Sequence, residues 1–352
     1  MQDPEFVHDN FTRFGKLLGS SEYARKLTRA SFYYKNSMLN QTIAGIKFSN
    51  PIGLSAGFDK DANLVSILPE VGFGYSQVGT VTYEAYEGNP KPRLYRLPKS
   101  KALVVYYGLK NIGVKKIAKK LKRLPKNKNF PISISVGKTN CKRTATVEAG
   151  IEDYYDCYKY LVEENIGDFY TINISCPNTF GGEPFTTPKE LDMLLGQLRK
   201  VKNKKPMFLK MPIVLSWKEF EKLLKIAIKY KVDGVIIGNL NKDHKHSTIK
   251  DAIPNGIKGG ISGRPTWKLS NDLIANTYKN YGDKLTIVGV GGIFNAQDAY
   301  EKIKLGSSLI QLITGMIYEG PQLIGEINEG LVELMERDGY SNISEAVGAS
   351  VK

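Results

Sequence analysis

Two side chains in the middle of the chain have types and surroundings suited to proton or electron chemistry. Cys176 lies in the segment Asn173-Ile-Ser-Cys-Pro-Asn178, where the following proline biases the cysteine toward an extended backbone and holds its thiol at the mouth of a loop. A cysteine with a pKa near ~8.5 is partly thiolate at neutral pH, and a cationic neighbour would increase the thiolate fraction. Lys210 lies between apolar residues, where it could form a Schiff base or place a fixed positive charge beside an electron-rich ring.

Glycine is concentrated in three short segments of the C-terminal half. These are Gly256-Ile-Lys-Gly-Gly-Ile-Ser-Gly263, Gly289-Val-Gly-Gly292 and Thr314-Gly315. Glycine lets backbone N–H groups approach a phosphate closely, although the same residues also make simple turns. Because the second and third segments follow the last two apolar runs of the chain, we interpret them as loops that hold a phosphorylated ligand.

The elements that position these groups are short apolar runs rich in β-branched residues, most of them followed by a stretch with helical periodicity. The predicted strands are Ile52–Ala56, Tyr75–Thr80, Pro131–Val136, Phe169–Ser175, Pro206–Met211, Gly234–Gly238, Leu285–Val290 and Ser308–Thr314. The predicted helices are about Ala62–Glu70, Val114–Leu124, Thr146–Glu164, Pro188–Lys202, Trp217–Tyr230, Thr266–Tyr281, Asn295–Lys304 and Pro321–Arg337. Eight strand-then-helix units predict an α/β fold, the (β/α)8 TIM barrel, whose usual length is ~250 residues.

The ends of these strands place a polar set of side chains around one mouth of the barrel. The set is Lys60, Thr80, Ser135, Asn173, Cys176, Asn178, Lys210, Asn239 and Thr314. It is nearly free of carboxylates, which predicts that no divalent metal binds there. The histidines at positions 8, 244 and 246 lie away from any predicted strand end, so a serine–histidine–aspartate triad has no candidate.

About a hundred residues exceed the usual barrel length, and they fall in three places. Residues 83–111 and 240–263 follow strand ends, which predicts lids or pocket walls on the face where barrel enzymes build their sites. Residues 1–41 predict a helical hairpin, because Val7, Phe11, Phe14 and Leu18 recur at helical spacing and a second helical stretch, Glu22–Tyr34, follows. On pattern alone, packing of this apolar face on the barrel (residues 42–352) is favoured over contact with a membrane or an apolar ligand.

The composition is that of a soluble globular protein, with 352 residues, 41% hydrophobic and 24% charged, and a mean hydropathy of -0.28. No apolar run approaches the ~18 residues of a spanning helix, and the N-terminus lacks the features of a secretory signal or transit peptide, which predicts a cytosolic location. Three cysteines without the spacing of a disulfide framework or zinc site fit a reducing compartment. We interpret Cys141 and Cys157 as inert.

The net charge of +15 raises nucleic acid and anionic membranes as candidate partners. Nine basic residues and no acidic one lie between Lys110 and Lys128. We favour a solvated helix face over a docking surface for this run. The sequence contains no recognisable nucleic-acid-binding motif, which predicts that nucleic acid is not a partner.

Six motifs spread over the chain together match one family. They are Gly53-Leu-Ser-Ala-Gly-Phe-Asp-Lys60, Val78-Gly-Thr-Val-Thr82, Gly88-Asn-Pro-Lys-Pro-Arg-Leu94, Ile172-Asn-Ile-Ser-Cys-Pro-Asn-Thr179, Gly260-Ile-Ser-Gly-Arg-Pro265 and Val288-Gly-Val-Gly-Gly-Ile293. From Asp3 to about Glu326 the sequence resembles the dihydroorotate dehydrogenases, the FMN enzymes of pyrimidine (UMP) biosynthesis. The Asp-Pro-Glu-x-x-His start resembles the quinone-linked branch, in which a helical hairpin forms the quinone entrance. This implies peripheral contact with the inner face of the cell membrane.

The resemblance implies a role for each residue at the predicted mouth. FMN would contact Ala56, Gly57, Thr80, Ser135, Asn173, Lys210, Gly238 and Gly263 with its ring and ribityl chain, and Gly292, Ile313 and Thr314 with its phosphate. Dihydroorotate would contact Lys60, Tyr107, Gly108, Leu109, Asn173, Asn178 and Asn239. Cys176 would be the catalytic base, and Lys210 would stabilise charge on the reduced flavin.

Two departures from the family pattern keep alternatives open. The quinone-linked branch has serine as its base, whereas Cys176 is typical of the soluble branch that uses fumarate or an iron–sulfur partner. Val105 stands where the family has an asparagine that contacts orotate, which keeps a related cyclic amide open as the substrate. Two further alternatives are a Schiff-base aldolase that uses Lys210 and a non-catalytic protein that binds anions or nucleic acid through residues 110–128.

Overall fold

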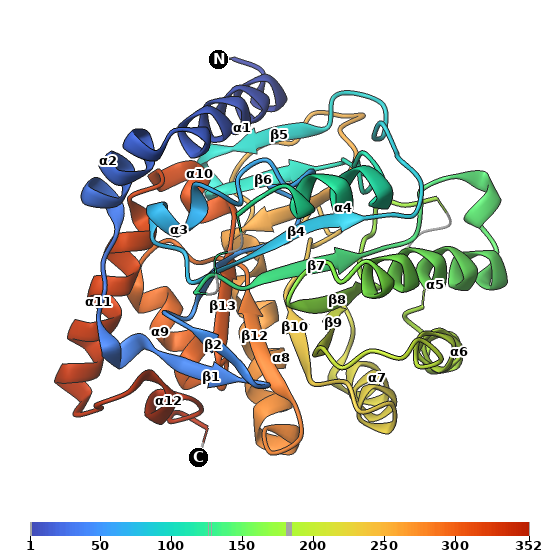
Figure 1. Cartoon of the computed structure of the whole chain (residues 1–352). Coiled ribbons are helices and arrows are strands. Elements are labelled where there is room, and N and C mark those ends of the chain that lie inside the picture. The colour runs from blue at the N-terminus through green and yellow to red at the C-terminus, as the bar shows by residue number, and fades with distance from the viewer. Residues whose placement is uncertain (1, 126, 128, 181–184, 352) are drawn as a thin grey trace.

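Eight parallel strands close into a barrel in the computed structural model, which describes residues 2–125, 127, 129–180 and 185–351 (Figure 1). Each strand pairs with its neighbours in parallel, and the first strand of the barrel pairs with the last, so that Ile52 lies opposite Ile310. This confirms the predicted (β/α)8 barrel. The strands are β3 (Ile52–Leu54), β4 (Tyr75–Val81), β7 (Ile132–Val136), β8 (Phe169–Asn173), β9 (Met207–Met211), β10 (Gly234–Ile237), β12 (Thr286–Val290) and β13 (Leu309–Leu312).

Helices surround the barrel, and seven of the eight predicted ones are present (Figure 1). Thr146, Thr187, Ser216 and Asn295 each accept a backbone N–H bond with the side chain and so fix the starts of four of them. The seven are α4 (Val114–Lys122), α5 (Val147–Glu163), α6 (Pro188–Leu198), α7 (Trp217–Lys229), α8 (Trp267–Tyr281), α9 (Ala296–Lys304) and α11 (Leu323–Asp338).

The helix predicted over residues 62–70 is wrong, because this stretch forms mainly turns and ends in a four-residue helix, α3 (Leu68–Val71). Ala62 has a φ of 54°, a left-handed backbone that interrupts a right-handed helix. The buried carboxylate of Asp59 accepts hydrogen bonds from the backbone N–H groups of Asn63 (2.7 Å) and Leu64 (2.9 Å), which fixes a turn in its place.

The sequence did not predict two small antiparallel sheets. The hairpin of β1 (Gln41–Ile43) and β2 (Ile46–Phe48) precedes the barrel. The two insertions pair with each other, because β6 (Ala102–Val105) lies between β5 (Leu94–Leu97) and β11 (Gly260–Gly263). This second sheet lies beside the first N-terminal helix, α1 (Pro4–Ser20), in Figure 1. Two short helices, α10 (Thr314–Glu319) and α12 (Ile343–Ala346), complete the chain.

Side chains fill the barrel interior in layers, because inward-pointing positions on a strand are two residues apart. The lowest layer is apolar and consists of Tyr75, Phe169, Phe208, Ile236, Val288 and Leu309, with Phe48 of β2 packed against it. The next such positions on β4, β8, β9 and β13 are polar: Gln77, Thr171, Lys210 and Gln311. There, Gln77 Nε2 donates to Ser133 Oγ (3.2 Å) and Thr171 Oγ1 (2.7 Å). Polarity therefore increases toward the carboxyl ends of the strands.

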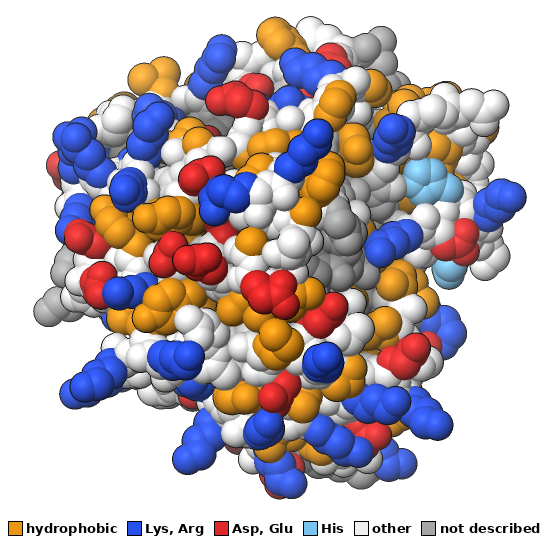
Figure 2. All heavy atoms as spheres, turned by 90° about the vertical axis from the view of Figure 1, so that its right-hand side faces the viewer, with side chains coloured by type: hydrophobic (Ala, Val, Ile, Leu, Met, Phe, Trp, Pro, Cys, Tyr) orange, Lys and Arg blue, Asp and Glu red, His pale blue; other side chains and the backbone are white. Residues whose placement is uncertain are grey.

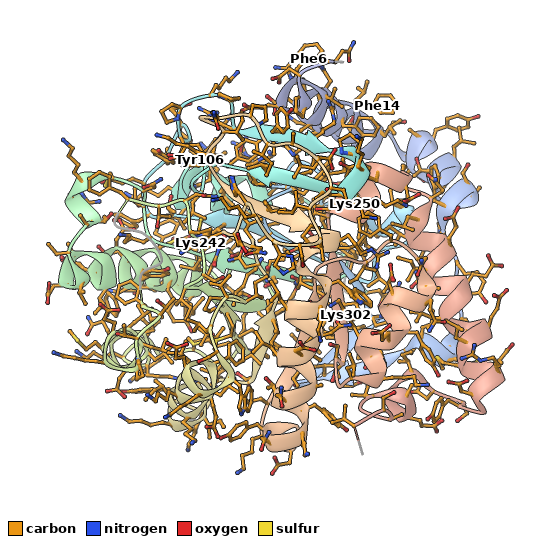
Figure 3. All side chains as sticks on the ribbon, turned by 180° about the vertical axis from the view of Figure 1, so that it is seen from behind. Phe6, Phe14, Tyr106, Lys242, Lys250 and Lys302 are labelled. Atoms are coloured by element: carbon orange, nitrogen blue, oxygen red, sulfur yellow. The ribbon has the colours of Figure 1, made fainter. Side chains whose placement is uncertain are left out.

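The N-terminal residues form the predicted helical hairpin, with α1 (Pro4–Ser20) and α2 (Glu22–Phe32). Leu18 packs on the core, but Phe11 and Phe14 are each 58% exposed, so the packing predicted for this apolar face is wrong at these two residues. Figure 3 shows Phe6 and Phe14 pointing away from the barrel. The exposed apolar side chains of the hairpin are Phe6, Phe11, Phe14, Leu17, Tyr23 and Leu27. Among the described residues, no helix is long and apolar enough to cross a membrane.

Charge is distributed unevenly over the surface. Lys115, Lys116 and Lys119 on α4 are exposed, while Lys126 and Lys128 of the predicted basic run lie outside the described residues. Acidic side chains gather on the face formed by α5 and α6, where a groove is lined by Glu148, Glu152, Asp156 and Asp192 (Figure 2). The excess of positive charge is therefore not spread over every face.

The packing of the lowest barrel layer predicts that two phenylalanines contribute very differently to the free energy of unfolding. Phe208 is 2% exposed and Phe14 is 58% exposed. We expect Phe208→Ala to lower the free energy of unfolding by about 3–5 kcal/mol, because it leaves a cavity among packed rings. Phe14→Ala, the matched control, should change it by less than about 0.5 kcal/mol. Urea unfolding measures both values, and similar losses for the two variants would contradict this packing.

Candidate active site

Three neighbouring strands hold a chain of hydrogen-bonded side chains at the top of the barrel. Thr80 Oγ1 on β4 lies 2.9 Å from Ser135 Oγ on β7, and Asn173 Nδ2 on β8 donates to Thr80 Oγ1 (2.8 Å). All three residues are buried. They were predicted as cofactor contacts, and the structure brings them together as one polar wall at the carboxyl ends of adjacent strands.

Lys210 on β9 is a buried cation inside the barrel. Its side chain is opposite Asn173 in register and reaches toward the end of β3, where Nζ donates to Ser55 Oγ (3.4 Å). Burial lowers the pKa of Lys210 to about 8, and the nearby Cys176 opposes this shift. Within the described part of the chain the ammonium group forms no salt bridge, so an electron-rich or anionic ligand at the mouth would stabilise its charge.

The loop that carries Cys176 is tied to two other segments. Asn178 Nδ2 donates to the backbone carbonyl of Val105 on β6 (2.8 Å), and Asn239 Nδ2 donates to Ser175 Oγ (2.6 Å) after β10. The carbonyl of Asn178 accepts a bond from Asn89 Nδ2 (2.9 Å) in the first insertion. These bonds fix the Cys176 loop beside the polar wall, close enough to Lys210 for Cys176 to oppose the lowering of the lysine pKa by burial.

The predicted substrate residues Lys60 and Tyr107 lie against each other. Lys60 Nζ is 3.9 Å from the centre of the Tyr107 ring, a cation–π contact. Burial lowers the pKa of Lys60 to about 8. The hydroxyl of Tyr107 is buried and has no hydrogen-bond partner among the described residues. A ligand that accepts a hydrogen bond could satisfy it.

Two more predicted contacts, Gly108 and Leu109, continue from Tyr107 toward the polar wall. Asn140 Nδ2 donates to the carbonyl of Gly108 (3.0 Å). A Cβ placed on Gly137 would contact both Leu109 (2.9 Å) and Thr80 (2.6 Å), so Leu109 lies next to that wall. The predicted substrate and cofactor residues therefore share one rim.

The glycine segments form the opposite side of the mouth. Thr314 Oγ1 donates to Ser262 Oγ (2.9 Å), and a Cβ on Gly263 would contact the carbonyl of Lys101 and the Thr314 methyl. Gly263 has a φ of 89° and Gly292 a φ of 72°, backbone conformations that side chains rarely permit. Ile313 lies 3.8 Å from the Cβ position of Gly57. The residues predicted at the phosphate end thus line one continuous segment of the rim. Gly238 directly follows β10, and Ala56 lies two residues after the end of β3.

Sequence reasoning missed the part that α1 plays in this mouth. Asp3 caps α1, and the residues at the second and fifth positions of the helix, Glu5 and His8, face the barrel. Glu5 forms a buried ion pair with Arg93 of the first insertion (3.0 Å), and His8 Nε2 lies 3.1 Å from the Phe58 carbonyl and 3.4 Å from Lys60 Nζ. The prediction that the histidines lie away from strand ends is therefore wrong for His8. The sequence did contain a signal for this contact: two polar residues, Glu5 and His8, lie at helical spacing directly after an Asp-Pro cap.

Docking of α1 through His8 predicts a pH-dependent stability. Burial and the neighbouring Lys60 charge lower the pKa of His8 to about 4, below its ordinary value of 6.5. Between these values the unfolded chain binds more protons, so the free energy of unfolding falls as the pH is lowered from 7 to 5, by about 1–2 kcal/mol from this group. His8→Asn should remove that part of the pH dependence in urea unfolding. An unchanged dependence in the variant would show that His8 is not held neutral against Lys60.

Comparisons with known proteins agree with this geometry. The family model described as dihydroorotate dehydrogenase matches residues 38–335. The chain is 39% identical to the "Dihydroorotate dehydrogenase (quinone)" of Crocosphaera subtropica over 90% of this chain and 85% of that protein. It is 35% identical to the protein of the same name from Nostoc punctiforme, over 99% and 94%. The crystal structure of DHODH from Eimeria tenella in complex with ferulenol superposes with a TM-score of 0.85 at 25% identity, over 99% of this chain and 96% of that one. The chain belongs to the dihydroorotate dehydrogenase family.

Proposed function

We propose that the protein oxidises dihydroorotate to orotate with FMN bound across the barrel mouth, and that it passes the electrons to a quinone. The observation that carries the proposal is the grouping of Cys176, Lys210 and Lys60 around one mouth, where neither the buried Lys210 nor the half-buried Lys60 forms a salt bridge among the described residues. Similarity to relatives named as quinone-linked dihydroorotate dehydrogenases supports both the substrate and the acceptor.

The residues present fit FMN on two independent grounds. Gly57, Gly263 and Gly292 have φ values of 113°, 89° and 72°, so their turns carry no side chain and their backbone N–H groups can approach a phosphate or a ribityl chain closely. The buried ammonium group of Lys210 is suited to a ring that gains negative charge. FMN, when bound there, supplies a hydride acceptor. Thr80, Ser135 and Asn173 would orient its ring through the hydrogen-bonded wall.

The protein's own side chains would bind the substrate, remove its proton and stabilise the charge on the ring. Lys60 and the amides of Asn178 and Asn239 would bind the carboxylate and ring amides of dihydroorotate. Because its pKa is about 8, Lys60 is charged at neutral pH and attracts a carboxylate strongly in a site with little water. Cys176 Sγ would take the proton from the carbon next to the ring carbonyl, while hydride leaves the adjacent carbon. Lys210 would hold its positive charge beside the ring throughout.

Val105 favours a second candidate, the oxidation of a related cyclic amide. The side chain of Val105 is apolar, and the Asn178 amide already donates to the Val105 carbonyl. Both features reduce the number of polar groups that β6 offers to the amides of orotate. Each amide of the ligand left without a partner would weaken its binding free energy by about 1–3 kcal/mol. A cyclic amide that places an apolar edge against Val105 would fit the site better.

The surface of the hairpin supports the quinone as acceptor and a membrane as the place where the protein meets it. The exposed apolar side chains of α1 and α2 are interspersed with Arg13, Lys16 and Lys26, which are also exposed. Apolar side chains with basic neighbours bind anionic lipid surfaces peripherally. These features support peripheral contact of the protein with the inner face of the cell membrane, with α1 between the lipid and the barrel mouth.

An anaerobic visible spectrum tests the proposed reaction. Dihydroorotate should bleach the yellow wild-type protein, and Cys176→Ala should keep its flavin but lose turnover by about 10²–10⁴-fold, because the proton has no acceptor. Cys141→Ala, a change at a half-buried cysteine with no proposed role in the reaction, should leave turnover unchanged.

Four results would contradict the proposal at different points. A colourless protein that FMN does not reconstitute would exclude the cofactor. Bleaching by another dihydropyrimidine and not by dihydroorotate would establish the second candidate. Normal turnover in Cys176→Ala would exclude Cys176 as the base. Reoxidation by fumarate and not by quinone would exclude the acceptor.

The exposed apolar face of the hairpin predicts binding to lipid vesicles. The double substitution Phe14→Glu, Leu17→Glu should weaken cosedimentation with phosphatidylglycerol-containing vesicles by at least about tenfold, because two apolar side chains no longer enter the lipid. Met193→Glu, an exposed apolar residue on α6, is the matched control and should bind like the wild type. Equal binding by all three proteins would exclude this face as the membrane contact.

A further inference from the structure

Lys302 on α9 is a fully buried cation that the proposed reaction does not use. Its exposed fraction is 0%, and its ammonium group bonds neutral groups of α8: Nζ donates to Ser270 Oγ (2.7 Å) and to Asn271 Oδ1 (2.6 Å). Nζ also lies 4.6 Å from the centre of the Trp267 ring. Figure 3 shows Lys302 between the ribbons of α8 and α9. In the described part of the chain it has no salt bridge.

The same residues of α8 form the floor of the glycine turn after β12. A Cβ on Gly291 would lie 3.5 Å from Ser270 Oγ, and a Cβ on Gly292 would lie 2.8 Å from Trp267 Cβ. Lys302 Nζ contacts the same two residues, Ser270 and Trp267. These two side chains therefore link the ammonium group of Lys302 to the turn.

The carboxylates nearest Lys302 are engaged by other groups. Burial lowers the pKa of Lys302 to about 7, against the effect of Glu301 and Asp298 and with a smaller contribution from Arg264. Asp298 is already held by Arg264 in a two-pronged ion pair (3.0 and 2.9 Å), and Glu301 accepts a bond from Asn271 Nδ2 (3.1 Å). A buried cation with neutral hydrogen-bond partners favours an anion nearby, because the surrounding dielectric is low.

We propose that Lys302 is a positioning residue for the phosphate end of the flavin: it supports the Gly291–Gly292 turn through Ser270 and Trp267 and places a positive charge behind it. The inference rests on the proposed function and adds to it a residue that does not contact the ligand. The positive charge of Lys302 attracts the negatively charged phosphate of FMN. Riboflavin lacks this phosphate, so Lys302 increases the affinity for FMN and not that for riboflavin.

The experiment measures flavin affinity by fluorescence quenching on the full-length apoprotein, without turnover. In Lys302→Met the dissociation constant for FMN should rise by about ten- to thirtyfold, while that for riboflavin changes by less than about twofold. Lys302→Gln, which is neutral but keeps a polar end, should behave in the same way. Lys268→Met on α8 removes an exposed cation and should leave both constants unchanged.

The outcomes separate this inference from the proposed function. Failure of the wild-type protein to bind either flavin would reject the proposed function itself. Binding of FMN by the wild type, with equal weakening of FMN and riboflavin in the Lys302 variants, would overturn the inference, because it would show a structural role alone. Unchanged FMN affinity, or loss of a cooperative melting transition in both variants, would also overturn it.

Discussion

The alternation of side chains along eight closed parallel strands is the constraint on which the rest of the molecule depends. Once β3 pairs with β13, every second residue must point into a space that admits neither helices nor bulk water. The lower end is filled by aromatic and aliphatic groups such as Phe169 and Phe208. Hydroxyl, amide and ammonium groups then follow toward the carboxyl ends. The chemistry is consequently confined to one end of the barrel, where Asn173 and Lys210 lie side by side in register.

Elements outside the barrel complete the mouth that this constraint creates. The sheet of β5, β6 and β11 joins two insertions far apart in the sequence, and the Val105 carbonyl on this sheet holds the loop of Cys176 through Asn178. Helix α1 reaches the same region through the Glu5–Arg93 pair and through His8 beside Lys60. The hairpin that carries the exposed apolar face is thus in direct contact with the proposed substrate lysine.

Local patterns in the sequence predicted the barrel well, because each strand is an apolar run whose periodicity is visible within a few residues. The same reasoning placed Thr80, Ser135 and Asn173 at strand ends, and the structure joins them by hydrogen bonds. Sequence reasoning failed where a structure depends on residues far apart in the chain or on an unusual backbone conformation. The pairing of β6 with β11 joins Val105 to Gly260, and Ala62 adopts a left-handed backbone in a stretch that reads as helix. Lys302 was missed because a lysine on an amphipathic helix is ordinarily exposed.

The pairing of β3 with β13 also determines when the barrel can form during synthesis. Residue 54 ends β3 and residue 309 begins β13, so the first barrel strand has no partner on one side until nearly the whole chain has been made. At ~5–20 residues per second, this wait is on the order of ten to fifty seconds. Throughout it, one edge of β3 and the edge of the most recent strand remain open to pairing with other chains. A ribosome that stops before residue 309 therefore releases an open sheet with two unpaired edges, a natural target for chaperones and proteases.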